Sequence, residues 1–92
     1  MEFTKEMAQR LRMLCVSNII DVGDLIEDSG LSICVIDHYL KGDYDIIEIE
    51  HLRGLANAFY MPPDELYEQL KGNKPLKGRF GTYIDFNRNK RK

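Results

Sequence analysis

The stretch that decides the fold runs over residues 21–42 and reads DVGDLIEDSGLSICVIDHYLKG. Its first half predicts a short helix after Asp21, because that carboxylate can accept hydrogen bonds from the free amides of a first turn. Asp24 adds negative charge in the same turn, where the helix dipole favours it. The apolar face would consist of Leu25 and Ile26. Gly30 is expected to end the helix, since glycine readily adopts the left-handed conformation found there.

The second half of this stretch predicts another short helix, over residues 33–41. Ser32 is the expected cap, and Gly42 is the expected end. Ile36 and Tyr39 lie three residues apart and would form the buried stripe. Two short helices joined by a glycine turn, the second capped by serine, form a helix-turn-helix arrangement.

The residues before this stretch predict one more helix, over residues 5–17, with Thr4 as its cap. After it, Asp45 and Glu48 have capping-box spacing and predict a fourth helix over residues 46–60. The expected inner face of that helix consists of Ile49, Leu52, Leu55, Ala56 and Phe59.

A fifth helix is expected to begin at Pro63, because a proline at the first helical position loses no hydrogen bond. Leu66, Tyr67 and Leu70 would face inward, and Gly72 would end the helix. The sequence therefore predicts an all-α, five-helix domain over residues 1–72.

Residues 73–92 differ in character and are predicted to form a linker, a short strand and a basic tail. Asn73, Pro75 and Gly78 mark the linker. The run 79–86 alternates, so that one face of a strand would carry Phe80, Thr82, Ile84 and Phe86. A lone strand needs a hydrogen-bonding partner. That partner is the same strand of a second copy in a homodimer, the body of the domain, or the sheet of another protein.

Charge is divided unevenly along the chain. Residues 1–71 hold six Lys and Arg against fourteen Asp and Glu, a net charge of −8, whereas residues 72–92 hold seven against one, a net of +6. A basic tail of this kind either contacts nucleic acid or an acidic partner, or it serves solubility alone. Its candidate phosphate contacts are Lys74, Lys77, Arg79, Arg88, Lys90, Arg91 and Lys92.

Several classes of protein are not expected. Cys15 and Cys34 have no CxxC spacing and are expected to be reduced thiols. The N-terminus lacks the apolar centre of a signal peptide. From both observations we expect a cytoplasmic protein. No run approaches the roughly 20 apolar residues of a membrane span. His38 and His51, both expected at the surface, show no metal spacing with the cysteines, and nothing indicates a cofactor or a catalytic site.

Residues 5–71 resemble the Cro/repressor type of helix-turn-helix domain, the lambda-repressor-like fold of the Xre family. The likeness is carried first by Leu11, Arg12 and Leu14, and then by Leu25, Ile26, Gly30, Leu31, Ser32, Ile36, Tyr39 and Gly42. It ends in Leu55-Ala56-Asn57-Ala58-Phe59 and Asp64-Glu65-Leu66-Tyr67, which are similar to the family's closing segments.

This resemblance implies a transcriptional regulator of phage or mobile-element type that binds double-stranded DNA as a dimer. In that family the helix at 33–41 would lie in the major groove. The implied contact residues are Val22, Ser32, Ile33, Cys34, Asp37, His38 and Lys41, with Asp43 beyond them.

The expected recognition face departs from the family. Val22 stands where a glutamine is usual, and Ile33, Cys34, Asp37 and Leu40 stand where polar or basic residues are usual. Asp37, Asp43 and Asp45 would repel phosphates, which supply much of the affinity of DNA-binding proteins. Ile33 could still touch a thymine methyl group, and Asp37 could accept from a cytosine amino group.

Three interpretations of this face stay open: some of these side chains belong to the core of a rotated helix, they bind a protein, or they read DNA. The alternative function is accordingly a helix-turn-helix scaffold that binds and inhibits a protein, for example a host nucleic-acid-binding protein, whose phosphate site clustered carboxylates could occupy. Antitoxin-like and purely structural roles remain behind these two.

Overall fold

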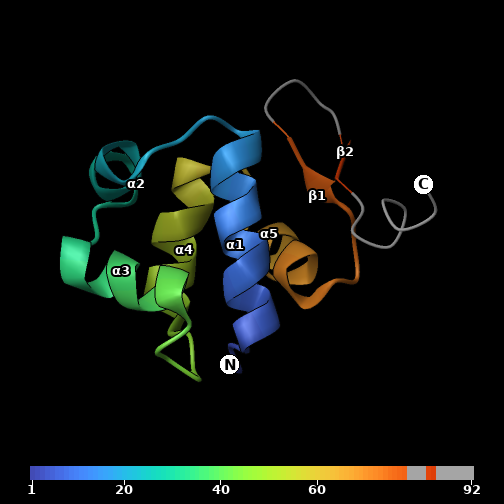
Figure 1. Cartoon of the computed structure of the whole chain (residues 1–92), viewed down its shortest axis with the longest axis horizontal. Helices are drawn as coiled ribbons and strands as arrows, with labels where there is room; N and C mark the ends of the chain where they lie inside the picture. Colours follow the sequence, from blue (N-terminus) through green and yellow to red (C-terminus); the bar gives the residue numbers. More distant parts are fainter. Residues whose placement is uncertain (79–82, 85–92) are drawn as a thin grey trace.

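The computed structural model describes residues 1–78 and 83–84, and this part of the chain is mostly helical. Five α-helices are followed by two short strands (Figure 1). The elements are α1 (Lys5–Ser17), α2 (Val22–Ser29), α3 (Ile33–Lys41), α4 (Ile49–Ala58), α5 (Pro63–Lys71), β1 (Leu76–Lys77) and β2 (Tyr83–Ile84). None of these helices is long and apolar enough to cross a membrane.

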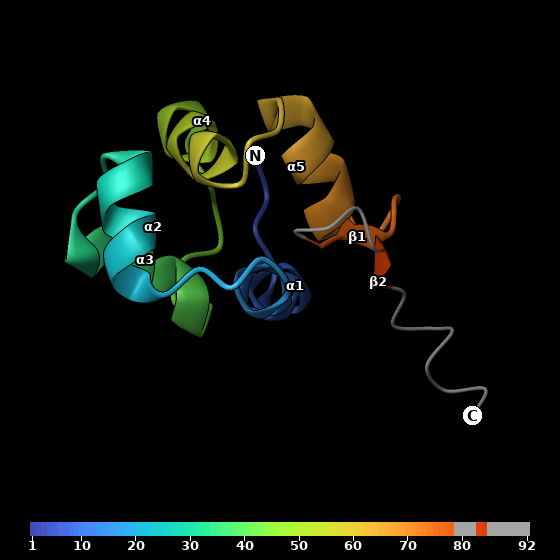
Figure 2. The same ribbon diagram turned by 90° about the horizontal axis from the view of Figure 1, so that it is seen from above.

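Helix α1 lies at the centre of the arrangement. It packs against α3 on one side and against α5 and β1 on the other, whereas α4 contacts α2 and α5. Figures 1 and 2 show the consequence: α2 and α3 form one flank of the molecule, and α5 with the strands forms the opposite flank. The pair α2–α3 therefore stands apart from the C-terminal segment.

The helix ends follow the predicted caps closely. Thr4, Asp21 and Ser32 each accept a hydrogen bond from a backbone amide three residues on, at 3.1, 2.8 and 3.3 Å. Gly30 and Gly42 have φ of +73° and +78°, the left-handed conformation that glycine adopts without strain. The predicted bounds of α1, α2, α3 and α5 are thus confirmed.

The predicted start of α4 is wrong. The helix begins at Ile49 rather than at residue 46, and Glu48 precedes it without a side-chain capping bond. The reason is that residues 45–47 pair with the N-terminal segment: Phe3 donates to the Asp45 carbonyl at 3.0 Å, and Ile47 donates to that of Met1 at 2.8 Å. This extended pairing buries Ile47, while Ile49, predicted to face inward, is 47% exposed.

The predicted linker contains structure as well. Leu76 and Lys77 form β1, which pairs in antiparallel register with β2, Leu76 opposite Ile84 and Lys77 opposite Tyr83. Leu76 is only 2% exposed and belongs to the core, so the core extends past the predicted boundary at residue 72. The buried amide of Gln69 holds the strand by accepting from the backbone amide of Lys77 at 3.1 Å.

A single hydrophobic core joins the five helices and β1. Its largest fully buried side chains are Tyr39, Phe3, Met7, Leu11, Leu14, Leu25, Ile36, Ile47, Leu52, Leu55, Leu66 and Leu70. Every helix contributes at least one member, so the position of α3 is set by packing against the rest of the domain and not by its own few turns.

Candidate functional site

Helix α3 is anchored through its inner face and its C-terminal end. Ile36 and Tyr39 point into the core. Two basic side chains of α1 reach the end of α3: the Arg12 guanidinium donates to the carbonyl of Leu40, and the Lys5 ammonium donates to that of Gly42 at 3.3 Å. Cations favour the negative end of a helix and satisfy carbonyls that have no partner within it.

This anchoring was not predicted, although the sequence contains its signal. Lys5 and Arg12 are seven residues apart and therefore lie on the same face of a helix. The pattern alone could not show which neighbouring helix that face would meet. Both side chains keep their charge but are held at the C-terminal end of α3 by these carbonyls.

The outer face of α3 forms a shallow hollow with the start of α2. Its lining residues are Val22, Ile33, Cys34, Asp37 and Leu40. Val22 is 43% exposed and Ile33 is 57% exposed, and Cys34 is exposed beside them. Leu40 is half-buried and packs against the core. The rotated-helix interpretation is therefore wrong for Ile33 and Cys34 and right only for Leu40.

The charged side chains at this face are paired with one another. The Lys41 ammonium lies 3.0 Å from the Asp37 carboxylate one turn earlier, and this hydrogen bond raises the pKa of Lys41. His38 Nδ1 lies 3.1 Å from a carboxylate oxygen of Asp43. Both candidate cations of α3 thus face a carboxylate, so neither side chain is directed freely toward a ligand.

A group of aromatic rings supports the end of α3 from behind. Tyr39 makes edge-on contacts with Phe3, Tyr44 and His51, with ring centroids 5.2, 4.6 and 5.5 Å apart. Its hydroxyl lies 2.6 Å from His51 Nδ1. The prediction that His51 is an ordinary surface residue is therefore wrong: the ring is half-buried and hydrogen-bonded.

The predicted C-terminal contacts fall only partly within the described residues. Lys74 forms an ion pair with Glu65 at 2.7 Å, and Lys77 lies on β1. Of the predicted dimerisation strand, Ile84 belongs to β2 and has a partner strand within the chain. The remaining predicted residues lie outside the described part: Arg79, Phe80, Thr82, Phe86, Arg88, Lys90, Arg91 and Lys92.

No family model, curated protein or solved structure matches this chain. The function is therefore argued from the site itself. Its distinguishing features are an exposed first turn of α3, an apolar hollow beside that turn, and cations that are already paired.

Proposed function

We propose that this chain is a helix-turn-helix protein of the Cro/repressor type that binds duplex DNA through α3 and regulates transcription. The observation that carries the proposal is the placement of α3. Its inner face is packed and its C-terminal end is tied to α1, while its first turn, with Ile33 and Cys34, stands exposed on one flank of the molecule.

This placement suits the major groove. The major groove of B-DNA is about 12 Å wide and admits an α-helix. Helix-turn-helix proteins reach base edges there with the N-terminal residues of the second helix. Here those residues are Ser32, Ile33 and Cys34, with Val22 beside them and Asp37 one turn further. Ile33 would contact a thymine methyl group, and Asp37 would accept from a cytosine amino group.

On this proposal the phosphate contacts come mainly from the C-terminal segment. Lys41 and His38 are paired with carboxylates, and Lys74 is paired with Glu65. The other basic residues of this segment, which we propose contact phosphates, are Lys77, Arg79, Arg88, Lys90, Arg91 and Lys92. A homodimer would double this basic charge and present two copies of α3. We propose that the dimer forms through the outer edge of β2, the strand that contains Ile84.

The experiment is a selection from random duplex DNA with the full chain, followed by fluorescence anisotropy on the selected sequence. We expect an enriched motif, and an affinity that falls steeply as salt is raised, because counterions are released from the phosphates. Asp37→Ala should alter the preferred sequence, whereas Asp64→Ala, the matched control on α5 at the opposite flank, should not. Absence of any enriched motif would contradict the proposal.

Removal of residues 87–92 tests the role of the tail separately. We expect affinity to fall by the same factor for the selected and for unrelated sequences, because phosphate contacts carry no sequence information. A truncated chain that binds DNA as tightly as the full chain would exclude a phosphate role for this segment.

A second function is favoured by the apolar hollow and the paired cations. We infer as the alternative that α3 binds a protein, for instance the nucleic-acid site of a host protein, with Asp43 and the neighbouring carboxylates replacing phosphates. Ile33→Asp and Val22→Asp should then abolish the complex without unfolding the domain, because both side chains are substantially exposed.

One pulldown from a bacterial lysate, with and without nuclease, separates the two functions. DNA binding predicts captured nucleic acid that nuclease removes. Protein binding predicts a captured protein that resists nuclease and is lost with Ile33→Asp. A protein that is retained by both Ile33→Asp and Val22→Asp would exclude the hollow as its binding site.

A further inference from the structure

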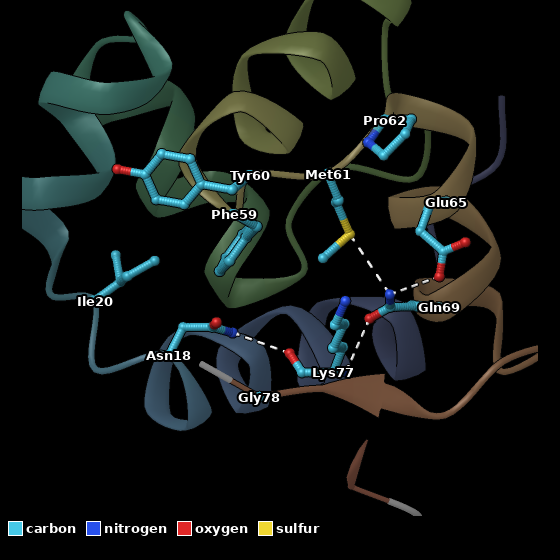
Figure 3. Close-up of a pocket in the computed structure, with 10 residues that line it drawn as sticks. All are labelled: Asn18, Ile20, Phe59, Tyr60, Met61, Pro62, Glu65, Gln69, Lys77 and Gly78. Atoms are coloured by element: carbon cyan, nitrogen blue, oxygen red, sulfur yellow. Dashed lines mark hydrogen bonds between the residues drawn. The ribbon is translucent and has the colours of Figure 1, made fainter. Parts of the chain in front are cut away.

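A larger hollow lies on the opposite side of α1 from α3, between the ends of α1 and α4, helix α5 and strand β1. It has a volume of about 760 Å³, within the range of small-molecule sites. Figure 3 shows its lining residues: Asn18, Ile20, Phe59, Tyr60, Met61, Pro62, Glu65, Gln69, Lys77 and Gly78. None of them belongs to the proposed recognition face.

Two walls of this hollow are built on strained backbone. Ile19 and Tyr60 have φ of +55° and +58°, the left-handed region that side chains other than glycine rarely adopt. Each follows a helix end at which the next residue donates back into the helix: Ile20 to the Cys15 carbonyl at 2.9 Å, and Met61 to that of Ala56 at 3.1 Å. Helices α2, α3 and α5 place a glycine at the equivalent position.

The strain at Tyr60 has no compensation in packing, because this side chain is 84% exposed. A glycine would make the same turn at lower conformational cost. Strained residues are concentrated at functional sites, and here the phenol of Tyr60 borders the hollow.

The interior of the hollow is apolar at one end and polar at the other (Figure 3). Ile20 and Tyr60 lie at the apolar end, above a floor formed by buried Phe59. At the polar end the Lys77 side chain extends from β1 toward Met61. A flat apolar molecule that lies over Phe59 and against Tyr60 can direct its polar group to the lysine.

The hydrogen bonds at the polar end decide the charge of that group. Both Glu65 oxygens are engaged, one by Lys74 at 2.7 Å and one by the Gln69 amide at 2.9 Å, so the charge of this carboxylate is balanced by Lys74. The Gln69 carbonyl oxygen accepts from the Lys77 backbone amide. Among the described residues, the Lys77 ammonium has no hydrogen-bond or ion-pair partner within bonding distance. Its charge acts on Glu65 only from farther away, where it helps to lower the pKa of that carboxyl group. The ammonium is therefore open to a direct contact with an anion.

We propose that this hollow is a binding site for a small aromatic carboxylate, whose ring packs between Tyr60 and Phe59 and whose carboxylate pairs with the Lys77 ammonium. The proposal rests on the hollow itself and is independent of what α3 binds. It adds a ligand site that shares no lining residue with the recognition face.

The test measures binding of 2-naphthoate to the full chain by isothermal titration calorimetry, with 2-naphthamide as the neutral analogue of the same shape. We expect a Kd for naphthoate of about 1 mM or tighter, as its size allows, and at least about fivefold weaker binding of the amide. Backbone NMR shifts should centre on residues 18–20, 59–61 and 77. No binding, equal binding of both probes, or shifts located elsewhere would overturn the proposal.

Two variants assign the roles. Lys77→Met should weaken naphthoate binding to the level of the amide, whereas Lys71→Met, which removes the same charge from α5 outside the hollow, should leave it unchanged. If both variants lost the same amount of naphthoate affinity, the effect of Lys77 would be general electrostatic attraction, and the proposed site would be wrong.

The variant Tyr60→Gly separates a role of the Tyr60 side chain in ligand binding from a purely structural role, because it is expected to change stability and affinity in opposite directions. It should raise Tm by about 4 °C or more, since the strained φ is relieved, and at the same time weaken naphthoate binding. A gain in Tm with unchanged affinity would show that the phenol does not contact the ligand and would contradict the proposed packing.

Discussion

The α-carbon of Gly54 on α4 faces the backbone carbonyl of Ser29 on α2 so closely that a methyl group added there would lie 2.7 Å from the oxygen. Real β-carbons do not approach an oxygen so closely, and here the neighbour is backbone that cannot rotate away. The contact brings α2 against α4 and thereby sets where α3, which follows after Gly30, emerges from the domain.

Gly54→Ala should therefore destabilise the domain. The substitution improves helix propensity by about 1 kcal/mol, but the overpacking costs about 1–3 kcal/mol and α2 has to move. We expect a net loss of about 1 kcal/mol, the middle of the resulting range, in urea unfolding followed by circular dichroism. Asn57→Ala, at an exposed position of the same helix, is the control and should change stability by less than about 0.5 kcal/mol. Equal stability of the two variants would show that α2 adapts freely.

Gln69→Ala should loosen β1 from the domain. The side chain is fully buried, accepts from the Lys77 amide and donates to Glu65, so its loss leaves a small cavity and an unpaired amide. Together these predict a loss of about 2–4 kcal/mol and faster hydrogen exchange at the Lys77 amide. Gln9→Ala, exposed on α1, is the matched control. Unchanged exchange at Lys77 would mean that Leu76 alone holds the strand.

The two cysteines should differ in reactivity. Burial raises the pKa of Cys15 to about 11, whereas Cys34 is exposed at the recognition face. Since the thiolate is the reactive species, iodoacetamide at about pH 8 should alkylate Cys34 first, as followed by mass spectrometry. Cys34→Ser should remove the fast phase and Cys15→Ser should leave it. A fast phase that survives Cys34→Ser would contradict the described burial.

Alkylation of Cys34 with a bulky reagent also tests the face on which it lies. On either proposed function the adduct fills the hollow beside Ile33, so we expect binding of the selected DNA, or of the protein partner, to be lost while the circular dichroism spectrum is retained. Full binding by the labelled protein would exclude this part of α3 from the interface.

Stability should fall with acid partly through Glu65. The hydrogen bonds from Lys74 and from Gln69 hold the pKa of Glu65 below its usual value. A carboxyl group with a lowered folded-state pKa contributes stability above its unfolded-state pKa, and that contribution is lost as pH falls through the folded-state value. Between about pH 5 and about pH 3 the wild type should therefore lose more stability than Glu65→Gln. Parallel pH profiles of the two proteins would show that the ion pair contributes nothing.

Most helix ends were predictable because their signals are local. Thr4, Asp21 and Ser32 cap amides only three residues away, so the residues that form these bonds are recognisable from the local sequence. The start of α4 was not predictable in this way. The capping-box spacing of Asp45 and Glu48 competes with pairing to residues 1–3, more than 40 positions away, and the distant pairing prevails because it buries Ile47.

The candidate site was predictable to a similar extent. The resemblance implied that Ile33 and Cys34 lie on the outside of α3, with a core position left open, and both side chains are exposed. Asp37 and Lys41 are four residues apart, about one helical turn, so their ion pair was predictable from the sequence. The bond between Arg12 and the Leu40 carbonyl was not, because it depends on how α1 and α3 pack.

The sequence by itself determined the helical segments, their caps and the division of charge, because these depend on residues within one or two turns of each other. Only the tertiary structure decided that β1 belongs to the core, that basic residues of α1 are used on α3, and that strained Tyr60 borders a hollow reached by Lys77. Those outcomes depend on which faces meet when the chain collapses. Burial of the core sets them, and no local pattern contains that information.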